Sequence, residues 1–175
     1  EPGERDLYAV GTVCHILQIV KTSDTTVRVV VEGESRARLL RLWQTQPFLQ
    51  GQAELLPEQP ARSTARTEAL LRRTYVLFDD YRQLASGLSD DFTAAVLDCR
   101  DAGELADLIA QNITLRHQDR QRVLEELHPE KRLRLVNDIL THEVDVLSLE
   151  SEMEQKVRRR VAQVQRDMIL REQVK

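Results

Sequence analysis

The last quarter of the chain begins His128-Pro129-Glu130-Lys131-Arg132-Leu133 and runs to Lys175 without another glycine or proline. Proline is favoured at the first position of a helix, because the N–H that it lacks would have no partner there. Most residues that follow are good helix formers. One helix over 129–175 would be about 70 Å long. We therefore predict a long helix whose first part joins a bundle and whose second part projects as an arm.

The apolar side chains of this stretch recur at steps of three and four residues, which is the helical period. In the first part these residues are Leu133, Val136, Leu140, Val144 and Leu147. In the second part a thinner seam consists of Met153, Val157, Val161, Val164 and Met168. A helix with one thin apolar seam either pairs with another helix or lies partly in water. The seam residues are therefore our candidates for self-association or for coupling to another part of a larger assembly.

The first third of the chain favours β-strands. Residues 7–10 lead into a strand over 12–20, whose two sides are both largely apolar, so we expect it to be covered on both faces. A turn at 22–25 leads to a partner strand over 26–31, which Glu32-Gly33 is expected to end. Gly33 is the natural place for a positive φ or a bulge. Two further strands are predicted over 36–43 and 48–56, and a helix is an alternative for the first of them.

The composition changes at residues 57–66, which include two prolines and have few apolar side chains to bury. Everything beyond this linker favours helices. We predict an α+β protein with an incomplete β-rich lobe over 1–56, a linker over 57–66, a helical bundle over 67–128 and the long helix over 129–175. Within the bundle, Gly87 is expected to stop the first helix, and Ser89 or Asp90, Asp101 and Thr114 are expected to cap the next three.

The sequence contains no recognisable catalytic or cofactor motif. Its six glycines form no phosphate-binding loop and its four histidines are scattered. Cys14 and His15 are neighbours on a predicted strand, so they point to opposite faces and cannot act as a nucleophile and its base. We predict no catalytic residue, cofactor or metal ligand. Two cysteines without a CxxC spacing favour the cytoplasm, and the sequence has no apolar run long enough to span a membrane.

Aromatic residues are the best candidates for contact with another protein. Trp43 and Phe48 flank a glutamine-rich bend, and they would anchor an unfolded peptide if exposed but belong to the core if buried. Tyr75 and Phe78 complete our four candidate contacts. The basic run from Lys156 to Arg160 could contact phosphates of DNA. A solvated helix face or a protein-docking face is favoured instead, because the run contains no aromatic side chain for base stacking.

The segment Glu32-Gly33-Glu34-Ser35-Arg36-Ala37 resembles the Glu-Gly-x-x-Arg-Ala motif of the N-terminal domain of the bacterial Lon family. Residues 7–12 are similar to that family's Val-Gly-Thr strand entry, 103–110 to its Leu-Ala-Asp helix, and 119–125 to a later helix. Residues 156–158 and 170–175 resemble its long helix. These segments occur in the family's order along essentially the whole chain, so the resemblance is far more specific than any one motif.

The resemblance implies a partial, PUA-like β-barrel lobe joined to a helical bundle whose last helix leads toward an ATPase ring. It implies a parent homo-hexameric serine protease with a Ser-Lys dyad that uses ATP and Mg²⁺, although no catalytic residue matches positions in this chain. It also implies that this part recognises unfolded or damaged proteins and helps assembly. The first strands of the family's barrel are not matched here, so open strand edges are expected.

Two functions therefore remain as alternatives at this point. The first is a non-catalytic module that recognises substrates and supports assembly of a Lon-type protease. The second is a structural or regulatory coiled-coil protein that dimerises through the seam on its C-terminal helix.

Overall fold

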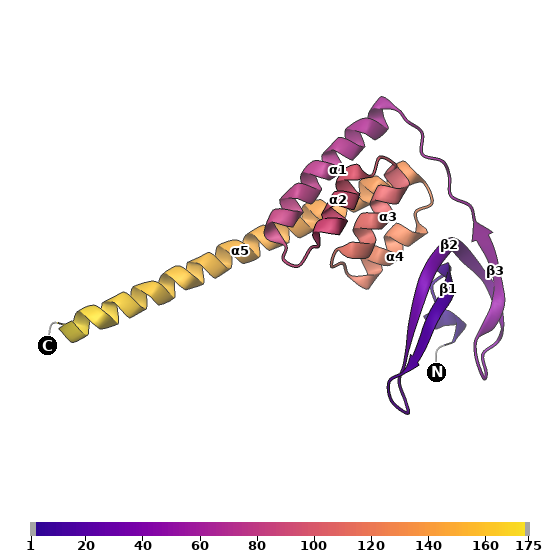
Figure 1. Cartoon of the computed structure of the whole chain (residues 1–175), viewed down its shortest axis with the longest axis horizontal. Coiled ribbons are helices and arrows are strands. Elements are labelled where there is room, and N and C mark those ends of the chain that lie inside the picture. Colours follow the sequence, from indigo (N-terminus) through magenta and orange to yellow (C-terminus); the bar gives the residue numbers. More distant parts are fainter. Residues whose placement is uncertain (1–2, 174–175) are drawn as a thin grey trace.

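The chain folds into an antiparallel sheet followed by a helical bundle, which confirms the predicted α+β class. The computed structural model describes residues 3–173. A short 3-10 turn, Glu4–Asp6, precedes strands β1 (Val10–Lys21), β2 (Val27–Gln44) and β3 (Gln50–Leu56), which pair in the order β1-β2-β3. The helices are α1 (Ala65–Leu84), α2 (Asp90–Asp98), α3 (Ala102–Asn112), α4 (His117–Glu125) and α5 (Pro129–Gln173). Figure 1 shows the sheet beside one end of the bundle and α5 projecting from the other.

Strand β2 is longer than the sequence predicted, because it does not end at Glu32-Gly33. The predicted strands over 26–31 and 36–43 are two halves of one 18-residue strand. Glu34 of β2 has no partner residue in the pairing with β1, and Leu40 and Trp43 have none in the pairing with β3. Such bulges bend and twist a strand without ending it. Residues 27–38 of β2 pair with β1 and residues 36–44 pair with β3, so only 36–38 have a neighbouring strand on both sides.

Gly51 allows β3 to follow this bulged part of β2 closely. A Cβ atom at Gly51 would lie 2.4 Å from the carbonyl oxygen of Arg41 and 2.9 Å from a methyl group of Leu42. The first distance is to backbone, which cannot rotate away. Only glycine fits this position without a shift of one strand.

The expectation that the first strand is covered on both faces is wrong. Ile16, Leu17 and Ile19 are each 62–63% exposed. Within the sheet the buried apolar side chains are Val10, Ala37 and Leu56, one from each strand, and all three lie at the end that meets the bundle. The rest of the sheet has no second layer of described residues to cover it, so its apolar side chains face water.

Two helices of the bundle, α2 and α3, begin at the capping residues that the sequence indicates. The hydroxyl of Ser89 accepts the N–H of Phe92, and the carboxylate of Asp101 accepts the N–H groups of Gly103 and Glu104. Gly87, at φ +85°, lies in the turn after α1. The cap predicted at Thr114 is wrong, because α4 begins after Arg116, which makes no side-chain capping bond. The chain runs extended at Ile113 and turns into the helix only after Leu115.

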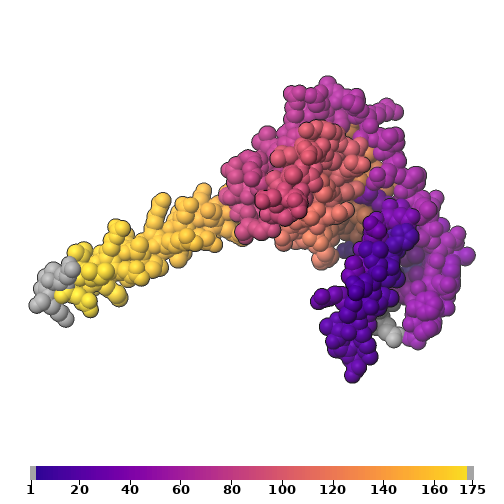
Figure 2. Space-filling view, in the orientation of Figure 1, coloured from indigo at the N-terminus to yellow at the C-terminus, as the bar shows by residue number. Residues whose placement is uncertain are grey.

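Helix α5 begins at Pro129, as predicted, and remains helical to Gln173. The predicted end at Lys175 lies outside the described residues. Leu133, Val136 and Leu140 are buried against the other helices, whereas the part beyond Ser148 stands alone (Figure 2). None of the helices in residues 3–173 is both long and apolar enough to cross a membrane.

Candidate functional site: the bare sheet and the cleft at its junction with the bundle

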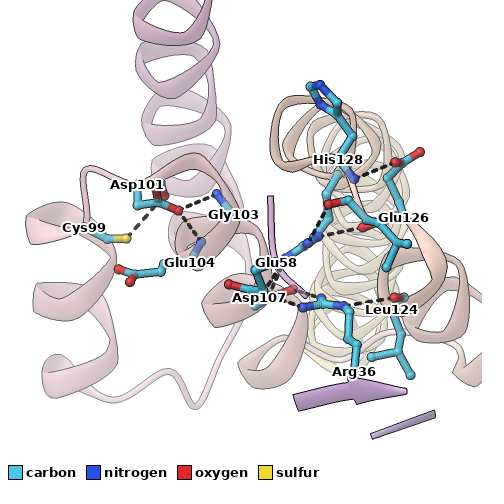
Figure 3. A network of polar contacts seen from close by, with 12 residues as sticks. Arg36, Glu58, Cys99, Asp101, Gly103, Glu104, Asp107, Leu124, Glu126 and His128 are labelled. Carbon is cyan, nitrogen blue, oxygen red and sulfur yellow. Dashed lines mark hydrogen bonds and ion pairs between the residues drawn. The ribbon is translucent and has the colours of Figure 1, made fainter. Parts of the chain in front are cut away.

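Arg36 of the Glu-Gly-x-x-Arg-Ala segment joins the sheet to the bundle. Its Nε donates to the carbonyl oxygen of Leu124 at 3.0 Å, its Nη1 to Glu58 at 2.8 Å and its Nη2 to Asp107 at 2.6 Å. The side chain is only 10% exposed. One planar guanidinium therefore connects β2 to the linker, to α3 and to α4 (Figure 3).

A second arginine approaches the same carboxylate from the long helix. Arg132, with a side chain 1% exposed, donates from Nη1 to the other oxygen of Asp107 at 2.6 Å. Its Nε donates to the carbonyl oxygen of Glu126 at 2.8 Å, and its Nη2 to that of Leu127 at 3.3 Å. Asp107 thus holds one guanidinium on each of its two oxygens. We call Arg36, Glu58, Asp107 and Arg132 the junction network.

The junction network is balanced in charge, with two guanidinium groups and two carboxylates. Glu58 also lies 3.5 Å from Nη1 of Arg132, although its side chain is 60% exposed. Buried charges are tolerated when they are paired and hydrogen-bonded. The network therefore acts as a structural joint between elements that are far apart in the sequence.

Sequence reasoning identified Arg36 only as part of a motif and missed the other three residues of the network. A signal for two of them was present. Asp107 lies beside the apolar stripe of its helix, between Leu105 and Leu108, and Arg132 directly precedes the core residue Leu133. A charged residue that lies next to a core stripe needs a partner, which the sequence alone did not identify.

An open cleft of about 780 Å³ lies beside the junction network. Its sheet wall includes Thr12, Gly33 and Leu55, and its bundle wall includes Ala110 and Val123. Arg36, Glu58 and Asp107 also line it. The exposed area of the walls is more apolar than polar, although Glu34, Gln111 and Arg120 also line the cleft, and the charged groups of the junction network are already paired. Such a cleft is suited to an apolar segment rather than to a free ion.

Trp43 and Phe48 are exposed, which decides the alternative left open by the sequence. Their exposed fractions are 56% and 62%. The guanidinium of Arg41 lies 5.9 Å from the centre of the Trp43 ring, a cation–π contact. The amide of Gln44 donates to the carbonyl oxygen of Phe48 and holds the bend between β2 and β3. These two aromatic side chains add to the exposed apolar side chains of the sheet.

Phe78 is wrong as a surface contact, because its side chain is 1% exposed. Its ring lies edge-on to that of Phe92, with centroids 5.4 Å apart, inside the bundle. Tyr75 is half-buried, donates its hydroxyl to the carbonyl oxygen of Cys99, and lies under the guanidinium of Arg100. The four aromatic candidates therefore do not form one surface, and only Trp43 and Phe48 are free to contact a partner.

The remaining predicted residues lie in two places. Within the motif, Ala37 is buried at the bundle end of the sheet and Glu32 is exposed on β2, whereas Gly33 lines the cleft. The seam residues Met153, Val157, Val161, Val164 and Met168 are between 51% and 65% exposed along the arm. In the basic run, Arg158 lies 3.9 Å from Glu154, one turn away.

Side chains of the types that bind metals do not gather in the described part of the chain. No group of three or more His, Cys, Asp or Glu side chains between residues 3 and 173 is placed to hold a metal ion. The thiol of Cys14 donates to the carbonyl oxygen of Thr12. Burial raises the pKa of the Cys99 thiol, which makes it a poorer nucleophile.

The chain thus combines a three-stranded sheet that exposes apolar side chains with a helical bundle whose last helix projects as an arm. Residues 1–142 match the family of ATP-dependent protease La (LON) substrate-binding domains. The chain belongs to this family, which confirms the resemblance noted in its sequence.

The chain is similar over its full length to much longer proteins. It is 38% identical over 175 residues to Lon protease of Desulfovibrio desulfuricans and 34% identical over 175 residues to Lon protease 1 of Bacillus subtilis. It spans 20% and 22% of these relatives, about a fifth of their length. Its fold is similar to the N-terminal domain of Mycobacterium avium complex Lon protease, with a TM-score of 0.61 and 24% identity over 76% of this chain and 70% of that one.

Proposed function

We propose that this chain is the non-catalytic substrate-recognition module of a Lon-type ATP-dependent protease. It binds unfolded or damaged proteins and passes them to an ATPase and protease ring, which uses ATP and Mg²⁺. In this proposal the module also contributes to homo-hexamer assembly and works in the cytoplasm. The two free cysteines support that location, because disulfides are rare there.

The observation that carries the proposal is the bare apolar surface of the sheet. The exposed apolar side chains of the three strands and the bend between β2 and β3 are Ile16, Leu17, Ile19, Val20, Val27, Val29, Val30, Val31, Leu40, Trp43, Phe48 and Leu55. These side chains lie on both faces of the sheet, and exposed apolar surface of this extent marks an interaction site. Its natural partner is a polypeptide whose own apolar side chains are exposed, which is the property that distinguishes an unfolded protein from a native one.

Trp43 and Phe48 are the expected anchors on this surface, because large aromatic side chains dominate binding energies. The surface is open rather than a deep pocket, so the binding should be weak. Weak binding suits a module that must release its substrate to the next part of the protease.

We expect the double variant Trp43→Ser/Phe48→Ser to bind an unfolded protein about tenfold more weakly, which corresponds to about 1.4 kcal/mol. Binding is measured by fluorescence anisotropy with one labelled protein in its unfolded and native forms. Trp43 is the sole tryptophan, so a shift of its emission gives a second, local readout in the unaltered chain. The matched control is Val76→Ser, which changes an apolar side chain equally exposed on α1. Equal affinity of the unaltered chain for both forms would contradict a recognition role.

The exposed seam of α5 favours a second function, self-association. We expect a dimer of the unaltered chain to dissociate in the variant Val157→Glu/Val161→Glu, because four carboxylates would enter the paired seam. Mass is measured by light scattering after size exclusion. The control Gln155→Glu/Ala162→Glu adds the same charge to the opposite side of the helix. If all three proteins have the same mass, the seam does not hold copies together.

A further inference from the structure

The sheet is attached to the bundle by few contacts. The linker between Leu56 and Ala65 contains no helix or strand. Beside the contacts of Arg36, the amide of Gln121 on α4 donates to the carbonyl oxygen of Val10 at 2.9 Å. The buried residues of the sheet are few: Val10 at the start of β1, Arg36 and Ala37 in the middle of β2, and Leu56 at the end of β3. The end of the linker is held on the bundle, where the hydroxyl of Thr67 donates to the carbonyl oxygen of Arg62 and Ala61 packs against the core. Between the sheet and the bundle, however, no broad apolar interface fixes the direction of the sheet.

We propose that Arg36 is a positioning residue that fixes the direction of the sheet relative to the long helix α5. The connection has two steps, Arg36 to Asp107 and Asp107 to Arg132, each 2.6 Å between the bonded atoms. Asp107 lies on α3, which packs against α5 within the bundle. The side chains of Arg36 and Arg132 are 10% and 1% exposed and that of Asp107 is 24% exposed, so both ion pairs are largely screened from water.

The fork shape of the guanidinium matters for this role. Arg36 uses Nε, Nη1 and Nη2 for acceptors on α4, the linker and α3. Three fixed directions from one planar group define an orientation, whereas the ammonium group of lysine is a single point of charge. Arg36 thereby also sets the width of the cleft, because it lies between the sheet wall and the bundle wall.

The consequence for function rests on the proposed recognition role of the sheet. A polypeptide held on the sheet is then held in one direction relative to α5, so a force on the polypeptide reaches α5 through the junction network. When the contacts of Arg36 are lost, the sheet turns about the linker while its binding surface and the bundle core remain intact. Arg132 still pairs with Asp107 in that case, so the bundle keeps a neutralised carboxylate.

The test measures the distance between the sheet and α5 with two spin labels by double electron–electron resonance. One label is placed on Cys14, which is exposed on β1. The other is placed on Asp138→Cys, at an exposed position of α5. Cys99→Ala removes the remaining thiol from the labelled chain. The variants are Arg36→Met and Arg36→Lys, and the control is Arg38→Met, which changes an exposed arginine two residues along the same strand.

We expect one narrow distance distribution in the otherwise unaltered labelled chain and in Arg38→Met, and a distribution at least twofold broader in Arg36→Met. Arg36→Lys keeps the charge without the fork and should also broaden the distribution, to a smaller extent. Equal widths in all four proteins would overturn the proposal. A lower melting temperature without broadening would also overturn it, because a merely structural role predicts that result.

Binding of the unfolded protein is measured on the same samples by anisotropy. We expect the affinity of Arg38→Met, which changes neither the exposed aromatic side chains nor the lining of the cleft, to stay within about twofold of the unaltered chain. A loss of more than tenfold in Arg38→Met would make it unfit as the control and would contradict a specific role of Arg36. An unaltered chain that does not bind would refute the proposed function and would leave the distance widths as a separate test of positioning.

Discussion

Arg132→Ala is expected to lower the free energy of unfolding by about 3–5 kcal/mol, the usual cost of removing one partner of a buried ion pair. The variant leaves Asp107 with a single guanidinium, and it leaves the carbonyl oxygens of Glu126 and Leu127 without their donors. It also creates a cavity at a side chain that is 1% exposed. Each of these losses lowers the free energy of unfolding, so this substitution should be among the most destabilising in the bundle.

The measurement is urea denaturation followed by far-UV circular dichroism, which reports the helices. The matched control is Arg134→Ala, two residues further along the same helix and exposed, with an expected effect within about 0.5 kcal/mol. Helix propensity cannot explain a difference between the two variants, because both replace arginine by alanine in the interior of α5. Equal destabilisation by the two substitutions would show that the junction network contributes nothing to stability.

The parts of the fold that depend on residues close together in the sequence could be predicted from it. Pro129 marks the start of α5, because proline has no N–H to donate and therefore fits the first turn of a helix but not its interior. This restriction depends on the residue itself and not on distant parts of the chain. Ser89 and Asp101 identify helix starts because each side chain bonds N–H groups two or three residues away. These features need no knowledge of what the helix packs against.

The parts that depend on distant segments could not be predicted in this way. The junction network combines residues from β2, the linker, α3 and α5, and no pattern within one segment specifies the other three. The apolar strand over 12–20 was expected to be covered, because alternation shows which residues share a face but not whether another layer lies against that face. The single strand through Gly33 escaped prediction for a related reason, since a bulge and a strand end have the same local signal.

The aromatic candidates show the same limit at the level of single residues. Phe48 and Phe78 are the same residue type, and each is followed within two residues by a polar or charged residue. The structure places the first on an open bend and the second against Phe92. What separates them is the helical period around Phe78, where Thr74 and Tyr81 are also buried and so define a core-facing side of α1.

This contrast predicts a large difference in stability between two aromatic substitutions. Phe78→Ala is expected to lower the free energy of unfolding by about 3–5 kcal/mol, because it removes a buried ring and leaves a cavity. Trp43→Ala should change it by less than about 0.5 kcal/mol, since an exposed side chain loses little packing. Binding of unfolded protein should follow the opposite order, with Trp43→Ala weakened and Phe78→Ala unchanged at temperatures where it remains folded. Urea denaturation and anisotropy on both variants measure the two properties separately. A destabilised Trp43→Ala with normal binding would mean that Trp43 is a packing residue, and the bare sheet would then lose its proposed anchor.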